Sequence, residues 1–218
     1  MSEPLNPDDF VITRRRKKFK FAMFANSSLC FELDEWKRAA IDVVEVGAGT
    51  GFFSVELASR HPEQTFLAVD VKGDRLQKGA YEAEARNLTN IRFLRARADQ
   101  LLEVVKPGSV SQVWLTFPDP FPKKRSAGRR LTNKTFLYTY TKMLRKSGTL
   151  YLKHDSREFF MWSLEQLVAY GWHIDELSFD LHDSDLSDDY KILTSYETRW
   201  LGEGLVTNFV RAHVPKNQ

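Results

Sequence analysis

From residue 41 onward, short apolar runs rich in β-branched residues alternate with amphipathic segments of helix length, and this alternation constrains the fold more than any other feature. The apolar runs predict strands near 41–47, 65–71, 91–96, 110–117 and 148–153. The segments between them predict helices at about 51–60, 74–87, 132–146 and 156–170. Two later segments, 172–181 and 205–214, alternate apolar and polar residues as the strands of an antiparallel pair do. We therefore expect an α/β fold: a mostly parallel, seven-stranded sheet with helices on both faces and an antiparallel edge strand.

The chain has 218 residues, enough for one α/β domain with a full core but few for two. We expect a domain at 41–218, preceded by a basic extension at 1–40 that is flexible in part. The single cysteine, Cys30, cannot form a disulfide within the chain, and the five histidines have no metal-ligand spacing. No apolar run has transmembrane length. These features predict a cytoplasmic protein without a metal site.

The net charge of +3 conceals two separate basic clusters. The first lies at 14–20, and the second consists of Lys123, Lys124, Arg125, Arg129 and Arg130. A solvated surface is the common explanation for one such cluster, but two of them favour contacts with the phosphates of a nucleic acid. The first cluster would act as an arm that orders on binding.

A glycine-rich turn follows the first predicted strand, in the stretch Glu45-Val46-Gly47-Ala48-Gly49-Thr50-Gly51. The next strand ends at Asp70, where a carboxylate can hold both ribose hydroxyls of an adenosine cofactor. A nicotinamide dinucleotide usually requires G-x-G-x-x-G, whereas this turn reads G-x-G-x-G after an acid. An acid favours a cation over a pyrophosphate, so the stretch indicates S-adenosylmethionine rather than a nicotinamide cofactor. An ordinary tight turn is the alternative without a ligand.

A proline-rich stretch, Phe117-Pro118-Asp119-Pro120-Phe121-Pro122-Lys123-Lys124-Arg125, follows the fourth predicted strand. Proline restricts its own backbone and disfavours helical geometry in the preceding residue, so we expect extended residues around a fixed Asp119 carboxylate. That carboxylate would lie past the carboxyl end of a strand, where open α/β sheets bind ligands. A surface turn with solvated lysines is the alternative.

Together with Arg129-Arg130-Leu131, Lys153-His154-Asp155 and Thr194-Ser195-Tyr196-Glu197, these stretches resemble the bacterial tRNA (guanine-N7-)-methyltransferase family. The resemblance spans roughly residues 41 to 214. The F-P-D-P-[WF]-P-K-K-R block is highly specific to that family, whereas the glycine turn is shared by class I methyltransferases. The resemblance implies a Rossmann-like class I fold. It also implies transfer of a methyl group from S-adenosylmethionine to N7 of guanine at position 46, in the variable loop of tRNA.

The resemblance also implies roles for individual residues. Cofactor contacts fall on Glu45, Gly47, Gly49, Asp70, Arg97, Asp99 and Asp119, and Asp119 is also the catalytic-site aspartate. Substrate contacts fall on Lys123, Asp155, Thr194, Ser195, Tyr196 and Glu197. Lys124, Arg125, Arg129 and Arg130 would bind the RNA backbone. One departure is the stretch Arg97-Ala98-Asp99, where the family usually has an Asp-Ala pair facing the adenine. Either the backbone frames the adenine while Asp99 supplies a carboxylate, or Arg97 stacks over the ring.

The chemistry of guanine defines what such a site must do. N7 carries an in-plane lone pair and no proton, so attack on a methyl group requires alignment and no general base. Asp119 can accept the N–H donors of the Watson–Crick edge and stabilise the positive charge that reaches the purine. Phe117 and Phe121 either stack on the base or belong to the core.

Three other functions remain open. A methyltransferase acting on an exocyclic amino group would use a D-P-P-Y type loop, and this chain lacks the paired prolines. A non-catalytic RNA-binding module is the second alternative, and a nicotinamide oxidoreductase is the third. We expect tRNA as the partner of a monomer or homodimer, with no membrane and no metal.

Overall fold

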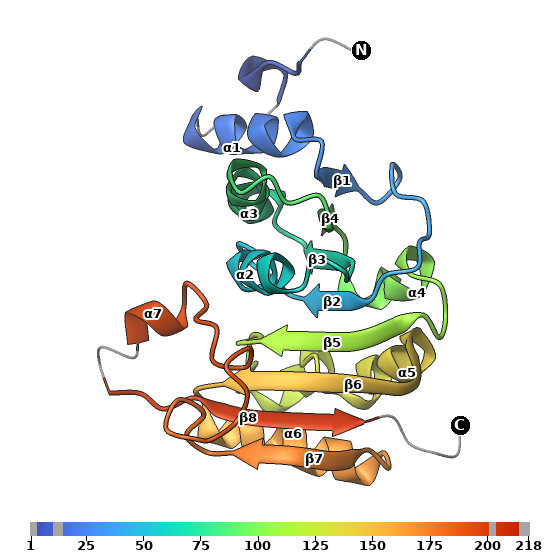
Figure 1. The fold of residues 1–218 in the computed structure, drawn as a ribbon, viewed down its shortest axis with the longest axis vertical. Helices are drawn as coiled ribbons and strands as arrows, with labels where there is room; N and C mark the ends of the chain where they lie inside the picture. The colour runs from blue at the N-terminus through green and yellow to red at the C-terminus, as the bar shows by residue number, and fades with distance from the viewer. Residues whose placement is uncertain (1–3, 11–14, 201–203, 214–218) are drawn as a thin grey trace.

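The computed structural model describes residues 4–10, 15–200 and 204–213. They form an eight-stranded sheet with helices on both faces (Figure 1). The strands are β1 (Cys30–Glu32), β2 (Val43–Val46), β3 (Phe66–Asp70), β4 (Ile91–Arg95), β5 (Val110–Thr116), β6 (Leu144–His154), β7 (His173–Ser178) and β8 (Asn208–His213). Their order across the sheet is β1-β4-β3-β2-β5-β6-β8-β7. All neighbouring strands from β1 to β6 are parallel, and β8 is antiparallel to both β6 and β7.

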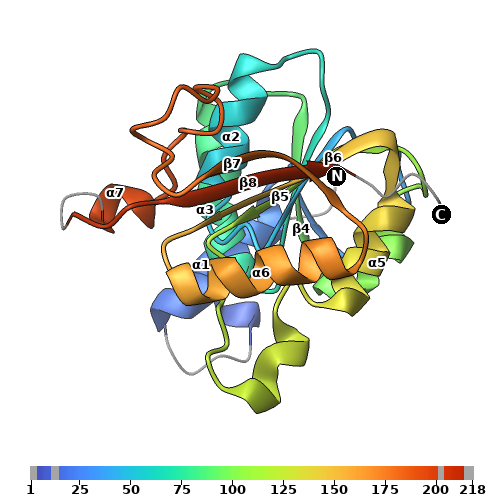
Figure 2. The ribbon, with the colours of Figure 1, turned by 90° about the horizontal axis from the view of Figure 1, so that it is seen from below.

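The helices are α1 (Arg15–Asn26), α2 (Phe52–Arg60), α3 (Gly73–Ala85), α4 (Leu101–Val104), α5 (Lys134–Met143), α6 (Arg157–Ala169) and α7 (Glu197–Trp200). Short 3₁₀ turns lie at η1 (Pro7–Asp9), η2 (Ala98–Gln100) and η3 (Lys124–Arg129). Side chains of α1, α2 and α3 share one apolar core with one face of the sheet, and those of α4, α5 and α6 share a second core with the other face. Figure 2 shows α2 and α6 on opposite sides of the sheet. Every helix in the described part of the chain is too short or too polar to cross a membrane.

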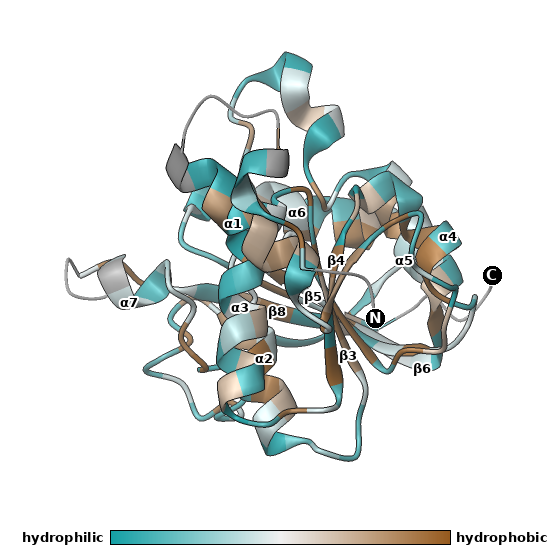
Figure 3. Cartoon of the chain, turned by 90° about the horizontal axis from the view of Figure 1, so that it is seen from above, coloured by the Kyte–Doolittle hydropathy of each residue, from teal (hydrophilic) through white to brown (hydrophobic). Residues whose placement is uncertain are grey.

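Hydrophobic residues concentrate in the strands and on the inner sides of the helices, while the outer helix surfaces are hydrophilic (Figure 3). On β2, Val44 and Val46 belong to one core and Val43 to the other, because successive strand residues point to opposite faces. The apolar runs found in the sequence are therefore strands that are covered on both sides. The predicted Rossmann-like arrangement is confirmed.

The strand count differs from the prediction, because β1 adds an eighth strand beside β4. It comes from a segment that the sequence analysis placed in the N-terminal extension. Helix α1 precedes it and lies against α3, with Phe24 only 2% exposed in the shared core. Arg14 of the basic run lies outside the described residues, and the rest of the run, 15–20, lies on α1.

The C-terminal strands also differ in detail from the prediction. The predicted antiparallel pair is present, since β7 and β8 run in opposite directions. The antiparallel strand is β8, which lies inside the sheet between β6 and β7, so the edge strand β7 runs parallel to β6. Strand β6 begins at Leu144 rather than at 148, with a register shift opposite Val110 and Gln112.

Candidate active site

A cavity of about 280 Å³ opens at the carboxyl ends of the parallel strands. It is lined by Val46, Gly47, Gly49, Val69, Asp70, Val71, Lys72, Arg75, Ala96, Ala98, Phe117, Pro118, Asp119, Phe121, Arg129 and Leu131. The glycine turn, the end of β3, the start of η2 and the proline-rich loop therefore meet at one place. These are four of the segments that the sequence analysis selected.

The glycine turn and Asp70 form one wall of the cavity. Gly47, Gly49 and Gly51 have φ values of 76°, 59° and 73°, in the left-handed region that favours glycine. The backbone N–H of Gly49 donates to Oδ2 of Asp70 at 2.9 Å, and the N–H of Lys72 donates to Oδ1 at 2.8 Å. A Cβ on Gly49 would meet no atom within 4 Å. The wall is thus held by backbone bonds and leaves open space beside Gly49.

Glu45 lies beneath the glycine turn and does not line the cavity. Its carboxylate is buried and accepts hydrogen bonds from Oγ of Ser54 at 2.6 Å and from Oγ1 of Thr116 at 2.5 Å. Burial raises the pKa of Glu45 to about 7, against the opposing effect of these two bonds. Glu45 therefore joins β2 to α2 and to the end of β5, directly before the proline-rich loop.

Arg97 and Asp99 stand beside the cavity without lining it; their neighbours Ala96 and Ala98 do so instead. Nε of Arg97 donates to Oδ1 of Asp99 at 2.9 Å, in an exposed ion pair. The hydrogen bond from Arg97 lowers the pKa of Asp99 below its ordinary value. The Arg97 guanidinium is therefore turned toward Asp99, and the cavity wall here consists of small side chains.

The backbone of the proline-rich loop differs from the prediction. Phe117 and Phe121, which both precede a proline, have φ values of 51° and 42° instead of extended geometry. Such geometry in a residue other than glycine costs about 1–3 kcal/mol and requires support from the surroundings. The N–H of Phe117 donates to the carbonyl of Lys153 at 2.9 Å. The carbonyl of Phe121 accepts two bonds from the Arg130 guanidinium, at 3.3 and 3.1 Å.

Asp119 is an exposed residue of this loop and lines the cavity. Among the described residues, no group forms a hydrogen bond or an ion pair with its carboxylate. The preceding residue, Pro118, is buried, and its carbonyl is held by Nε2 of His154 at 3.0 Å. Asp119 is thus a carboxylate on a supported backbone, with both oxygens available to a ligand.

The five cations of the second basic cluster have different surroundings. Lys123, Lys124 and Arg125 are exposed, and Arg129 lines the cavity with its guanidinium 4.5 Å from the ring centre of Phe121. Arg130 is only 7% exposed. Besides holding Phe121, its guanidinium lies 4.4 Å from the ring centre of Trp162. Arg130 therefore supports the loop from inside, and the other four cations face solvent.

The segment that ends in α7 lies beside the same cavity. Oγ of Ser195 is 3.3 Å from Oγ1 of Thr50 in the glycine turn. The Tyr196 hydroxyl donates to Oδ2 of Asp155 at 3.1 Å, and the Tyr196 ring lies 5.1 Å from that of Phe117. Phe117 lines the main cavity and also a small adjoining hollow, whose lining includes Asp155 and Tyr196.

Glu197 also lines this hollow, but its carboxylate is bonded to groups in the interior, and Oγ1 of Thr194 accepts a bond from the N–H of Glu197 at 3.1 Å. The Glu197 carboxylate is buried and accepts a bond from Nζ of Lys153 at 2.9 Å and from the N–H of Thr194 at 2.8 Å. The structure thus places Asp155 and Tyr196 in the hollow beside the cavity and Ser195 against the glycine turn, while the Glu197 carboxylate contacts the interior. Within the described residues, no cluster of three or more histidine, cysteine or acidic side chains could hold a metal ion.

Comparison with known proteins assigns the chain to a family. A family model described as "Putative methyltransferase" matches residues 39–208. The tRNA (guanine-N(7)-)-methyltransferase of Brevibacillus brevis is 38% identical over 161 residues, which cover 74% of this chain and 75% of that protein. The protein of the same description from Staphylococcus haemolyticus is also 38% identical, over 74% of each chain. The chain belongs to the tRNA (guanine-N(7)-)-methyltransferase family.

A solved structure, that of the 16S rRNA methyltransferase KamB, matches with a TM-score of 0.61 over 84% of this chain and 90% of that one. At 15% sequence identity this match concerns the fold alone. It supports the class I methyltransferase fold that the glycine turn and strand order indicate. The resemblance predicted from the sequence motifs is thus confirmed for the family and for the fold.

Several supporting residues of this methyltransferase site were missed by the sequence analysis. Ser54 and Thr116 hold Glu45, and His154 holds the loop of Asp119. Lys153 is 0% exposed although it carries a charge. The sequence contained one signal for it, because a lysine inside an apolar strand requires a buried partner.

Proposed function

We propose that this protein transfers a methyl group from S-adenosylmethionine to N7 of guanine in tRNA, at position 46 of the variable loop. The observation that carries the proposal is the unpartnered Asp119 carboxylate, placed in one cavity between the Asp70 wall and an exposed basic loop. Membership of the family supports the same reaction and substrate. We further propose a cytoplasmic enzyme that works as a monomer or homodimer.

The Asp70 end of the cavity fits the adenosine part of the cofactor, which supplies a methyl group on a cationic sulfur. Asp70 is fixed by two backbone bonds and can accept both ribose hydroxyls. Gly47 and Gly49 allow a ligand to approach the backbone closely. Ala96 and Ala98 present small side chains to the adenine, so Arg97 and Asp99 would act through the backbone between them. Glu45 would support the glycine turn from beneath, through its bonds to Ser54 and Thr116.

The Asp119 end fits the target base. The carboxylate accepts the two N–H donors of the guanine Watson–Crick edge and turns N7 toward the methyl group. N7 has no proton to lose, so the side chains here orient the base and need not act as a general base. Phe117 and Phe121 lie on either side of Asp119 and can contact the base face. Asp155 and Tyr196 line the adjoining hollow and Ser195 lies against the glycine turn, and these residues would offer acceptors and hydroxyls to base or ribose.

The tRNA backbone would lie along the exposed cations. We propose that Lys123, Lys124, Arg125 and Arg129 bind phosphates beside the cavity, and that Lys17, Lys18 and Lys20 of α1 add further phosphate contacts. Arg130 would act indirectly, because its guanidinium is already engaged with Phe121 and Trp162.

The test is transfer of a labelled methyl group to unmodified tRNA, with the modified nucleoside identified. We expect N7-methylguanosine from the wild type and a loss of about 10- to 100-fold in kcat/KM for Asp119→Ala, the range for hydrogen bonds to a charged group. Glu103→Ala, an exposed acid on α4 away from the cavity, is the control and should retain activity. Methylation of an exocyclic amine would contradict the N7 assignment. Tight tRNA binding without transfer would indicate a non-catalytic module.

A further inference from the structure

Lys153 is a charged side chain with no exposure to solvent. Its Nζ donates to Oε2 of Glu197 at 2.9 Å and to the carbonyl of Ile192 at 2.8 Å, and it lies 5.5 Å from the ring centre of Phe53. Burial lowers the pKa of Lys153, while the Glu197 carboxylate opposes this shift and favours the charged form. Both protein partners of the ammonium group lie in the segment 192–197, far along the chain from β6.

Glu197 is the partner of Lys153 in this buried ion pair, and its carboxylate accepts hydrogen bonds from several surrounding segments. Besides Lys153, its carboxylate accepts bonds from the N–H of Thr194 at 2.8 Å, from Nε2 of His182 at 3.1 Å and from Oγ1 of Thr207 at 3.4 Å. The pair therefore ties β6 to the residues that lead into α7 and to those that follow it. Its bonds converge on the segment 192–197.

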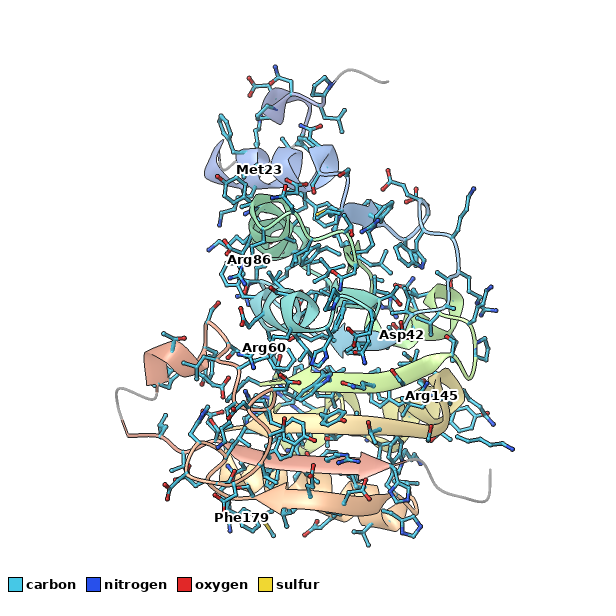
Figure 4. The ribbon with its side chains drawn as sticks, viewed as in Figure 1. Met23, Asp42, Arg60, Arg86, Arg145 and Phe179 are labelled. Atoms are coloured by element: carbon cyan, nitrogen blue, oxygen red, sulfur yellow. The ribbon has the colours of Figure 1, made fainter. Side chains whose placement is uncertain are left out.

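That segment lies at the carboxyl edge of the sheet. Figures 1 and 2 show α7 beyond the ends of β5 and β6, outside the helix layers. Earlier in the connection between β7 and β8, Asp189 accepts a bond at Oδ1 from Nη1 of Arg60 at 3.1 Å. Figure 4 labels Arg60 on α2. Nearer the cavity, the Ile192 side chain packs in the apolar core, and the buried polar contacts of the segment are those of Lys153 and Glu197.

Ser195 and Tyr196 lie between Ile192 and Glu197, the two partners of Lys153, and reach the proposed reaction site. Ser195 contacts Thr50 of the glycine turn, and Tyr196 contacts both Asp155 and Phe117. A shift of about 1 Å in groups that orient a substrate is enough to cost a large factor in rate. Because Tyr196 directly precedes Glu197, the position at which Glu197 is held affects where Tyr196 lies relative to the proline-rich loop.

We propose that Lys153 is a positioning residue, whose ion pair with Glu197 holds the segment 192–197 over the cavity and keeps Tyr196 beside Phe117 and Asp155 during methyl transfer. The inference rests on the proposed reaction. A buried ion pair is weak evidence for a stabilising role, because a well-packed apolar pair often serves stability equally well. A directional bond between two distant segments is a device for fixing their relative position.

The experiment compares wild type with Lys153→Met in the full chain. We expect kcat for tRNA methylation to fall by about 10- to 100-fold, as for lost bonds to a charged group, while the Kd for S-adenosylhomocysteine is unchanged. Hydrogen exchange should become faster in peptides covering 190–200 and stay the same in β5 and β6. Lys142→Met is the control, since this lysine lies over the Tyr138 ring on α5, away from the cavity. It should match the wild type in all three measurements.

A variant with wild-type kcat would overturn the proposal, and so would faster exchange throughout the sheet or loss of S-adenosylhomocysteine binding, because Lys153 would then support the core in general. If Lys153→Met fails to fold, the double variant Lys153→Met with Glu197→Gln buries no unpaired charge and should give the same results. Wild-type protein that forms no N7-methylguanosine would reject the proposed function itself. The exchange comparison would still judge whether Lys153 holds the segment.

Discussion

His154 donates a hydrogen bond from Nε2 to the carbonyl of Pro118 at 3.0 Å, while its Nδ1 accepts one from the N–H of Ser156 at 2.8 Å. The two bonds together require the neutral ring with its proton on Nε2. The ring is buried, and its centre lies 4.5 Å from that of Phe159. The loop that presents Asp119 is thus supported by one tautomer of one histidine.

His154→Ala should therefore lower both stability and activity. Two buried bonds are lost and the Pro118 carbonyl is left without its donor, which costs about 1–3 kcal/mol in the free energy of unfolding. Burial lowers the pKa of His154 in the folded protein, so the unfolded chain takes up the proton first as the pH falls below about 6.5. The free energy of unfolding of the wild type should therefore fall as the pH drops below about 6.5. The variant should lack the part of this fall that comes from His154.

Urea unfolding of both proteins between pH 5 and 8 measures the difference. A stability gap between wild type and variant that does not shrink on acidification would show that the neutral ring is not what supports the loop.

Arg130 and Arg125 should separate support of the loop from binding of RNA. Arg130→Ala removes the donor to Phe121 and the contact with Trp162, so we expect a loss of about 1–3 kcal/mol in stability together with lower kcat. Arg125 is exposed, so Arg125→Ala should leave stability unchanged and weaken tRNA binding. The slope of the logarithm of tRNA affinity against the logarithm of salt concentration should become smaller by about 1. Thermal unfolding and tRNA affinity at several salt concentrations measure both. Equal stability of the two variants would contradict the distinction.

Glu45 should make the stability of the protein depend on pH near neutrality. Burial raises the pKa of Glu45 to about 7 from an ordinary value of 4.5. As the pH rises from 4.5 to 7, the unfolded state loses the proton while the folded state keeps it, so stability falls, by about 3 kcal/mol in full above pH 7. Glu45→Gln should remove this decline while still allowing bonds to Ser54 and Thr116. Denaturant unfolding at pH 5 and pH 8 tests this, and an equal decline in both proteins would assign the effect to other groups.

The fold was largely predictable because strands covered on both faces must be apolar and helices must be amphipathic. The position of the site was also predictable, because parallel strands have their carboxyl ends at the same edge of the sheet. Gly49, Asp70 and Asp119 therefore meet in one cavity at that edge. Strand β1 was missed because three residues between polar segments carry no periodic signal. It forms only because β4 offers an unpaired edge.

The misjudged parts of the site share one cause: local sequence gives the charge or ring restriction of a residue, not the partners that the fold supplies. Arg130 and its exposed neighbours look alike in sequence, yet Arg130 is buried beside Trp162. The steric effect of proline favours extended geometry at Phe117 and Phe121, but bonds from distant segments hold both residues in the left-handed region. Tertiary contacts, which no local pattern contains, decided these positions.

Asp70 and Asp99 give a matched pair of acids at the cofactor end of the cavity. Asp70 lines it and is fixed by Gly49 and Lys72, whereas the Asp99 carboxylate is paired with Arg97 outside the lining. Asp70→Asn should weaken S-adenosylhomocysteine binding by about 10- to 100-fold, because an amide accepts fewer bonds from the ribose hydroxyls and a hydrogen bond to a charged group is lost. Asp99→Asn should leave the Kd close to the wild-type value. Isothermal titration calorimetry measures both; an equal loss in Asp99→Asn would mean that its carboxylate leaves Arg97 and contacts the adenine directly.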